Sequence, residues 1–146
     1  MFSRPFKIVA SKPPEALIRL LTSDHPFAVE LGRRISPPVP RHRRICRFCH
    51  CQGAVEDEVH ILLECQNDRL LQLREDMLLE GLRLLLPGIG QIYHRLGSME
   101  FLDFILGKEH LLLGFAQFVQ ATFEAVKSVS PFFPRSDDEL RALHHM

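Results

Sequence analysis

Residues 44–65 read RICRFCHCQGAVEDEVHILLEC and contain all four cysteines of the chain. Cys46 and Cys49 are separated by two residues, so one tight turn can bring both sulfurs to the same metal ion. His60 follows after ten further residues, and Cys65 follows His60 after four more. Three thiolates and one imidazole suit zinc in a closed tetrahedral site. The sequence therefore predicts one structural zinc ion bound by these four side chains.

Other interpretations of the same residues stay open. Cys51 is a further thiol that could replace Cys49 as a ligand. The four cysteines together could instead hold an iron–sulfur cluster. His50 is adjacent to Cys49 and offers an alternative imidazole. Cysteines are also common as small buried apolar residues, so the cluster could form without any metal.

The acidic residues do not indicate catalysis. A catalytic zinc keeps one coordination position open and needs a general base nearby, whereas four spaced protein ligands predict a closed site. The acids at 56–58 favour the start of a helix that carries His60, because acids suit the positive end of the helix dipole. The acidic pair at 137–138 also favours a helix start. We therefore expect no enzymatic activity.

Helices are expected on the carboxyl-terminal side of the cysteines. Asn67 or Asp68 can cap a helix that runs to about Leu86. Two further helices are expected over 98–106 and 108–129, where leucine and phenylalanine recur at helical spacing. These apolar stripes are typical of a packed core. The fold class predicted is a mostly α protein, a small helical domain around a zinc knuckle-like Cys/His centre.

The chain divides into three parts by composition. Residues 1–40 are expected to form a loosely structured N-terminal arm, with short helices opened at Pro13-Pro14 and Asp24 and a proline-rich connector. Residues 41–130 form the zinc-centred helical domain. Residues 131–146 form a tail that contains prolines and histidines.

Charge is distributed unevenly, although the net charge is zero. Between Leu31 and Val55 there are six arginines and no acid, whereas eight acids lie between Glu56 and Glu80. Closely spaced guanidinium groups favour phosphate binding, because they release counterions from a nucleic acid. The alternative is that the basic and acidic blocks are solvated faces that neutralise each other.

No segment resembles a signal peptide or a membrane span. The apolar region from Phe101 to Val119 is interrupted by charged residues and falls short of the ~20 apolar residues that cross a bilayer. We expect an intracellular protein, nuclear or cytoplasmic and not secreted. In that compartment clustered cysteines favour metal binding over disulfides.

The segment from Arg44 to Cys65 also resembles a known module. It is similar to the zinc-binding region that follows the reverse transcriptase domain of LINE-type (non-LTR) retrotransposons, as in fungal elements. Shared features are Cys-x2-Cys at Cys46 and Cys49, then Glu-Asp-Glu-x-His ending at His60, then a cysteine and a Leu-Arg helix. The resemblance extends over about Arg41 to Ser128. Two departures are Gln66-Asn67, where many relatives have a proline and an aromatic residue, and the additional Cys51.

The resemblance implies a part of a mobile-element protein, either detached or degenerate. The chain has no room for the palm domain of a reverse transcriptase and lacks its paired aspartates. In the intact family this region is thought to engage the nucleic-acid template or target. By resemblance, the four predicted zinc ligands carry over as metal ligands.

The function that we predict is a non-catalytic zinc-binding module that contacts RNA or DNA. Binding would be weak, would depend on salt and would show little sequence preference. The residues expected at the nucleic acid are Arg41, Arg43, Arg44, Arg47 and Phe48. Phe48 would stack on a base, and the alternative for this residue is packing on the helix below. The alternative is a zinc-stabilised protein-interaction or structural module, or an element remnant, without nucleic-acid binding. A protein partner is compatible with either prediction, and the oligomeric state is left open.

Overall fold

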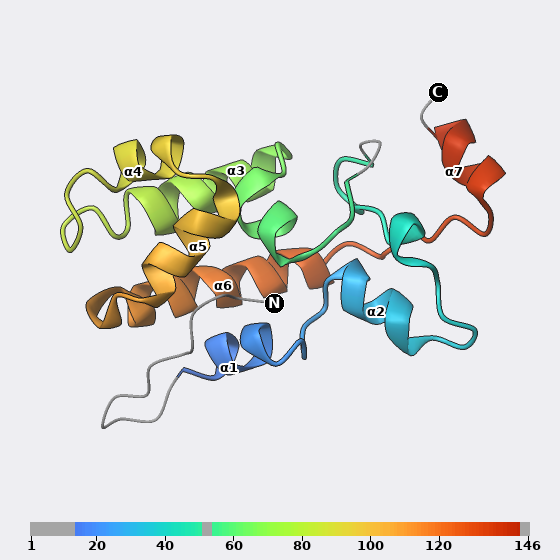
Figure 1. The fold of residues 1–146 in the computed structure, drawn as a ribbon, viewed down its shortest axis with the longest axis horizontal. Coiled ribbons are helices and arrows are strands. Elements are labelled where there is room, and N and C mark those ends of the chain that lie inside the picture. Colours follow the sequence, from blue (N-terminus) through green and yellow to red (C-terminus); the bar gives the residue numbers. More distant parts are fainter. Residues whose placement is uncertain (1–13, 51–53, 144–146) are drawn as a thin grey trace.

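The structure is a computed structural model that describes residues 14–50 and 54–143, and the described part is mostly helical, as predicted (Figure 1). Over these residues, paired backbone of the β type is confined to one isolated antiparallel bridge, between Ile45 and Val55. The helical elements, in which η marks 3-10 or π-helical turns, are α1 (Glu15–Leu21), α2 (Ala28–Arg34), η1 (Arg41–Arg43), η2 (His60–Glu64), α3 (Asp68–Leu73), η3 (Arg74–Leu79), α4 (Ile89–Arg95), α5 (Ser98–Leu106), η4 (Glu109–Leu111), α6 (Leu112–Lys127) and α7 (Asp137–Leu143).

Helix α6 is the centre of the hydrophobic core. Its phenylalanines Phe115, Phe118 and Phe123 recur at helical spacing and are almost completely buried. Helix α1 and the consecutive elements α3 and η3 pack along it. Burial of each such side chain contributes about 1.5–3 kcal/mol, so the stripe predicted over 108–129 is a main source of stability. The helix itself begins later than predicted, at Leu112, after the 3-10 turn η4.

The helix predicted from Asn67 to about Leu86 is shorter in the structure. Asn67 caps it as expected, because its side chain accepts hydrogen bonds from the amides of Arg69 and Leu70. The helix widens into the π-helical element η3, and helical structure ends at Leu79. The chain then turns and starts α4, which the sequence analysis did not predict. Gly88 adopts a positive φ of 84° immediately before α4, a conformation that glycine tolerates best.

The described part of the first segment belongs to the same core. Leu17 and Leu20 of α1 and Phe27 before α2 have no exposed surface, and α1 packs on α6. The predicted boundary at residue 40 is therefore not a boundary in packing. The expectation of a loosely structured arm otherwise falls on residues 1–13, which lie outside the described residues.

Within the described ranges, each helix is too short or too polar to cross a membrane.

Candidate metal centre

The fold brings together the four side chains that were predicted as zinc ligands. Cys46, Cys49, His60 and Cys65 each offer one ligand atom, and these atoms all lie within 4.8 Å of one another. The Cys46 and Cys65 sulfurs are 3.8 Å apart, and the Cys49 sulfur is 3.4 Å from His60 Nε2. Cys46 and Cys65 are buried, while the other two are partly exposed. The group could therefore hold a metal ion at the edge of the core.

The spacing of these atoms fits a tetrahedral ion. With Zn–S bonds of about 2.3 Å, tetrahedral geometry places two sulfurs about 3.8 Å apart. The Cys46–Cys65 distance matches this value, and the Cys49–His60 distance is close to that of a sulfur and a nitrogen on one zinc. Four protein donors complete a tetrahedron, so such a site has the closed coordination of a structural metal.

Local backbone structure positions both ligand pairs. The Ile45–Val55 bridge and the bond from the Cys46 amide to the Ala54 carbonyl close the cysteine turn. Of the second pair, His60 is the first residue of η2, and Asp57 Oδ1 accepts a hydrogen bond from its amide at 2.9 Å. Cys65 follows the last residue of η2, as predicted.

The carbonyl end of η2 is held by two side chains that sequence analysis did not assign to the site. Arg74 is only 2% exposed, and its guanidinium donates to the carbonyls of Leu62, Ile61 and Cys65 at 2.8, 3.3 and 3.1 Å. The Tyr93 hydroxyl donates to the adjacent Leu63 carbonyl at 2.5 Å. Burial lowers the pKa of Arg74, and neighbouring groups, Tyr93 and Cys65 first, oppose that effect. Arg74 thus fixes the turn that carries His60 and Cys65.

The two buried thiols form a hydrogen bond with each other across 3.8 Å. The hydrogen bond from the Cys46 thiol lowers the pKa of Cys65. The same hydrogen bond, together with burial, raises the pKa of Cys46. A cysteine binds a metal ion as the thiolate. A sulfur that ionises readily therefore leaves fewer protons for the metal to displace.

The alternative ligands are placed differently or lie outside the described residues. His50 is exposed and does not belong to the group of four. Cys51 falls within residues 51–53, which the structure does not describe, so its proposed roles as a zinc or iron–sulfur ligand are not tested.

Arg47 does not lie where the phosphate hypothesis placed it. Its side chain is 3% exposed, and it forms an ion pair with the fully buried Glu56, with Nη2 2.9 Å from Oε2. Its remaining donors bind the carbonyls of Pro26, Val126 and Val129. The prediction that Arg47 contacts phosphate is therefore wrong, because every nitrogen of this guanidinium is used inside the protein.

The other residues that were predicted to contact nucleic acid differ in how far their side chains are exposed to solvent. Arg44 is half-buried and donates to the carbonyls of Val39 and Val29. Phe48 is half-buried against the hydrophobic core, which is the packing alternative to base stacking. The Arg43 side chain is 19% exposed, whereas that of Arg41 is 59% exposed.

A second group of possible metal ligands is formed by His25, Glu30 and Glu58, all buried. His25 Nδ1 accepts a hydrogen bond from the Phe27 amide, so the ring proton lies on Nε2 and is donated to Glu58 Oε1 at 2.8 Å. Burial is the largest single influence and raises the pKa of Glu58. The His25 hydrogen bond, a backbone hydrogen bond and the charges of His25 and Arg41 together outweigh burial, so the pKa falls below its usual value. Because Nε2 is a donor, this group is better described as a hydrogen-bonded link between the segment before α2 and the metal loop, residues 46–65, which carry the four candidate ligands.

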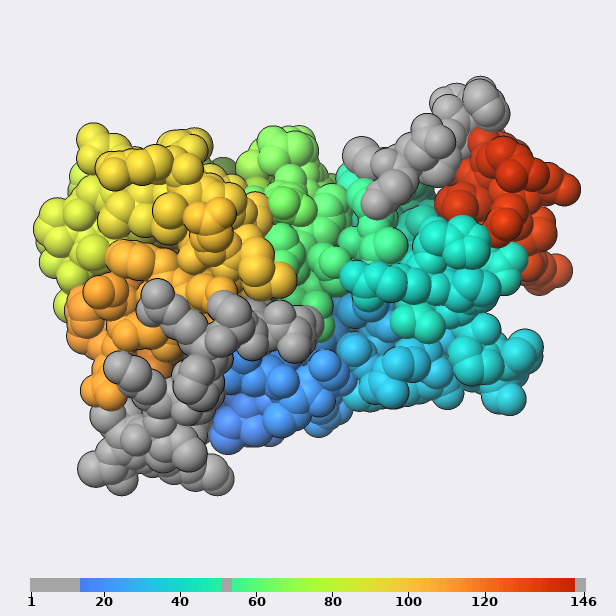
Figure 2. Space-filling model, in the orientation of Figure 1, coloured from blue at the N-terminus to red at the C-terminus, as the bar shows by residue number. Residues whose placement is uncertain are grey.

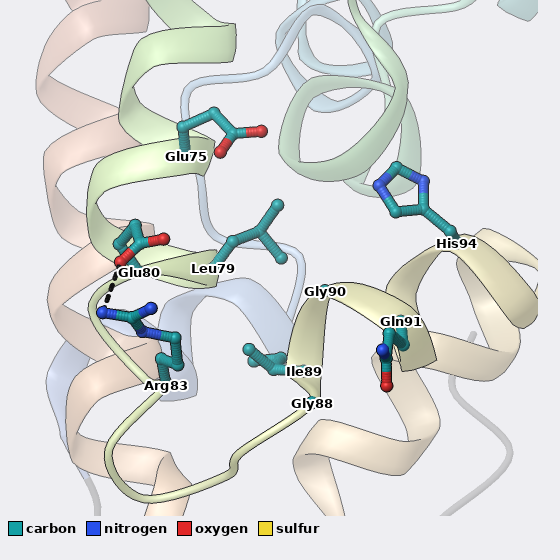
Figure 3. A pocket seen from close by; sticks show the side chains of 9 residues that line it. All are labelled: Glu75, Leu79, Glu80, Arg83, Gly88, Ile89, Gly90, Gln91 and His94. Carbon is teal, nitrogen blue, oxygen red and sulfur yellow. Dashed lines mark ion pairs between the residues drawn. The ribbon is translucent and has the colours of Figure 1, made fainter.

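A separate cleft of about 280 Å³ lies between η3 and the start of α4 (Figure 3). Glu75 and His94 extend from opposite sides of it, and Leu79 and Ile89 contribute its apolar lining. Among the described residues, this cleft does not include a group of side chains close enough to bind a metal. It is formed by different elements from the candidate metal centre.

Comparisons with protein-family models, with curated proteins and with solved structures find no match for this chain. The function proposed for the protein therefore rests on the residues of the site. Its relationship to retrotransposon proteins is a proposal that rests on the sequence resemblance.

Proposed function

We propose that the protein is a non-catalytic zinc module that binds nucleic acid through exposed arginines beside the metal loop. The observation that carries the proposal is the convergence of Cys46, Cys49, His60 and Cys65 within 4.8 Å. Thiolate and imidazole donors in this number favour zinc over the harder cations. Retrotransposon ancestry is part of the same proposal and rests on the sequence resemblance.

The metal is proposed to act structurally. Two ligands come from the cysteine turn and two from η2 and its end, so a bound ion joins segments that are separated by ten residues in the sequence. With four protein ligands, no coordination position is left for a water or substrate, which is why we propose no reaction. Binding free energy of the ion would add directly to the free energy of folding.

The proposed nucleic-acid surface omits Arg47, which is buried, and includes two arginines that were not predicted from the sequence. Arg33 and Arg34, at the end of α2, have side chains 57% and 44% exposed. Element η1 packs on α2, so Arg41 lies in the same region of the molecule. Arg33 pairs with Glu30, Arg34 with Asp24 and Arg41 with Asp57. The pairs of Arg34 and Arg41 are open to solvent and are worth only about 0–1 kcal/mol, so a phosphate can replace the carboxylate. Glu30, the partner of Arg33, is buried.

Fluorescence anisotropy with a labelled 20-nucleotide single-stranded RNA, and with single-stranded DNA of equal length, tests the proposal. Affinity should fall steeply between 50 and 200 mM salt, as expected when phosphate contacts release counterions. Arg41→Ala and Arg33→Ala should each weaken binding and each reduce the salt slope by about 1. A flat salt dependence, or no binding at low salt, would contradict the proposal.

Arg95 supplies the matched control for these variants. It is an exposed arginine at the end of α4, at the opposite end of the molecule from η1 in Figure 1. Arg95→Ala removes the same charge and should leave affinity nearly unchanged. Equal effects of Arg95→Ala and Arg41→Ala would indicate general attraction by net charge without a defined surface.

A purely structural or protein-interaction module is the second candidate. The internal pairing of Arg47 with Glu56 and of Arg41 with Asp57 favours it, because the basic and acidic blocks then neutralise each other within the chain. The double variant Arg34→Ala with Arg41→Ala distinguishes the candidates, because both side chains are largely exposed. Loss of nucleic-acid binding with an unchanged fold supports the first, and loss of folding or assembly supports the second.

A further inference from the structure

The carboxyl-terminal helix α7 contacts the basic turn η1. Asp137, the first residue of α7, places Oδ1 2.6 Å from His42 Nε2 and 4.0 Å from Arg43 Nη1. The same Arg43 nitrogen donates to the carbonyl of Arg135 at 2.9 Å. These contacts join residues that are more than 90 positions apart in the sequence. In Figure 2 the helix (red) lies directly against the residues around η1 (cyan).

The charges on the two sides of this contact are opposite. The first turn of α7 contains three consecutive acids, Asp137, Asp138 and Glu139. Element η1 contains Arg41, His42 and Arg43 and no acid. The Asp137 carboxylate accepts a hydrogen bond from the His42 imidazole and lies near the Arg43 guanidinium. It therefore occupies the position that a phosphate oxygen would take.

The contact is weak enough to be exchanged. The side chains of His42 and Asp137 are both 58% exposed, and exposed ion pairs contribute little. α7 has no fully buried side chain. Arg43 Nε is buried and has no hydrogen-bond partner, so this guanidinium is not fully satisfied by the tail. A polyanion could therefore offer Arg43 more acceptors than the tail does.

We infer that the acidic start of α7 is an intramolecular competitor for the nucleic-acid surface at η1. The inference rests on the proposed function and adds its regulation. The tail binds the His42 and Arg43 side chains, and a phosphate backbone must displace it to take over these contacts. A change that weakens the tail contact raises affinity without adding any new contact to the nucleic acid.

The test compares Asp137→Ala with Asp76→Ala in the full chain, using the labelled RNA at low salt. Asp76 is an exposed acid on η3, so both variants change the net charge by the same amount. Asp137→Ala should bind about two- to fivefold more tightly than wild type, the range expected for loss of an exposed ion pair. Asp76→Ala should bind like wild type. Circular dichroism and metal content verify that both variants keep the fold.

Limited trypsin digestion gives a second measurement that does not depend on a variant. Arg135 is exposed and directly precedes the tail helix. Added RNA should speed cleavage after Arg135 because it displaces the tail, while it protects Arg33, Arg34 and Arg41 from cleavage.

The outcomes of these experiments distinguish the competitor inference from the proposed function. If wild type binds RNA but Asp137→Ala binds no more tightly than Asp76→Ala, the competitor inference is overturned and the proposed function stands. If cleavage after Arg135 is unchanged or slower with bound RNA, the inference is overturned as well. If no variant binds, the proposed function fails and the inference fails with it.

Discussion

Arg47 and Glu56 form an ion pair inside the protein, with side chains 3% and 0% exposed and Nη2 2.9 Å from Oε2. Glu56 also accepts hydrogen bonds from the Arg47 and Ala28 amides. Arg47 in turn donates to carbonyls at the end of α6 and beyond it, and to the Pro26 carbonyl before α2. This pair therefore ties the cysteine turn to two other parts of the fold.

Removal of either partner of this pair should destabilise the protein strongly. Arg47→Ala leaves a buried carboxylate without its cation, and breaking such a pair costs about 3–5 kcal/mol in free energy of unfolding. Urea denaturation of the metal-loaded protein measures the change. Arg41→Ala is the matched control, since its exposed pair with Asp57 should contribute no more than about 1 kcal/mol. Equal, small effects of the two substitutions would contradict the structural role of Arg47.

Loss of one metal ligand should remove zinc and most of the stability of the metal loop. We expect about one zinc per chain in wild type, by elemental analysis of protein purified without added metal. Cys65→Ser should lose the metal, and chelation of wild type should lower its melting temperature to that of the variant. Cys51→Ser should keep both metal and melting temperature. Loss of zinc in Cys51→Ser would assign Cys51 to the site in place of one of the four predicted ligands.

Arg74 should affect metal affinity although it does not touch the metal. Arg74→Met keeps an unbranched side chain in the core but removes the hydrogen bonds to the Ile61, Leu62 and Cys65 carbonyls. Loss of groups that orient metal ligands typically lowers metal affinity about 10- to 100-fold. Competition with a zinc indicator measures this affinity. Arg69→Met, an exposed change on α3, is the control and should leave zinc affinity unchanged.

The contact between the tail and η1 should be visible in the titration of Asp137. The hydrogen bond from His42 lowers the pKa of this carboxyl below its usual value, with smaller contributions from Arg43 and Arg141. Because the folded pKa is lowered, the contact is present above the ordinary aspartate pKa and is lost as the pH falls through the lowered value. Carboxyl carbon NMR measures the pKa directly. His42→Gln should raise it towards the ordinary value, and an unchanged pKa would show that His42 does not hold the tail.

Local sequence rules predicted the parts of the site that depend on short spacing. The convergence of Cys46 and Cys49 and the position of Cys65 after a helical turn are present in the structure. Of the three acids before His60, only Asp57 caps the turn, whereas Glu56 and Glu58 are buried against Arg47 and His25. The Asn67 cap was predicted for the same reason, because an asparagine side chain reaches amides two and three residues later. These features involve neighbours in sequence, so their geometry follows from residue type and spacing.

Which arginines are exposed and which are buried could not be predicted in this way. Arg41 and Arg47 belong to one basic block, but the first is exposed and the second is buried against Glu56 and the end of α6. Which arginine points inward depends on where α6 lies, and α6 begins 65 residues after Arg47. The pattern of charges shows where basic and acidic residues lie along the sequence. It does not show which of them the fold brings against α6.

The sequence by itself determined the helical class, the four metal-ligand candidates and the apolar stripe of α6, because each depends on periodicity or short spacing. Only the tertiary structure decided that Arg74 binds the carbonyls of η2, that His25 links to Glu58 and that Asp137 covers His42. These contacts join residues 12 to 95 positions apart. The Arg74 and His25 contacts form because a buried polar group must find a partner inside the protein. Asp137 and His42 are exposed, and they meet because the fold brings the start of α7 against η1.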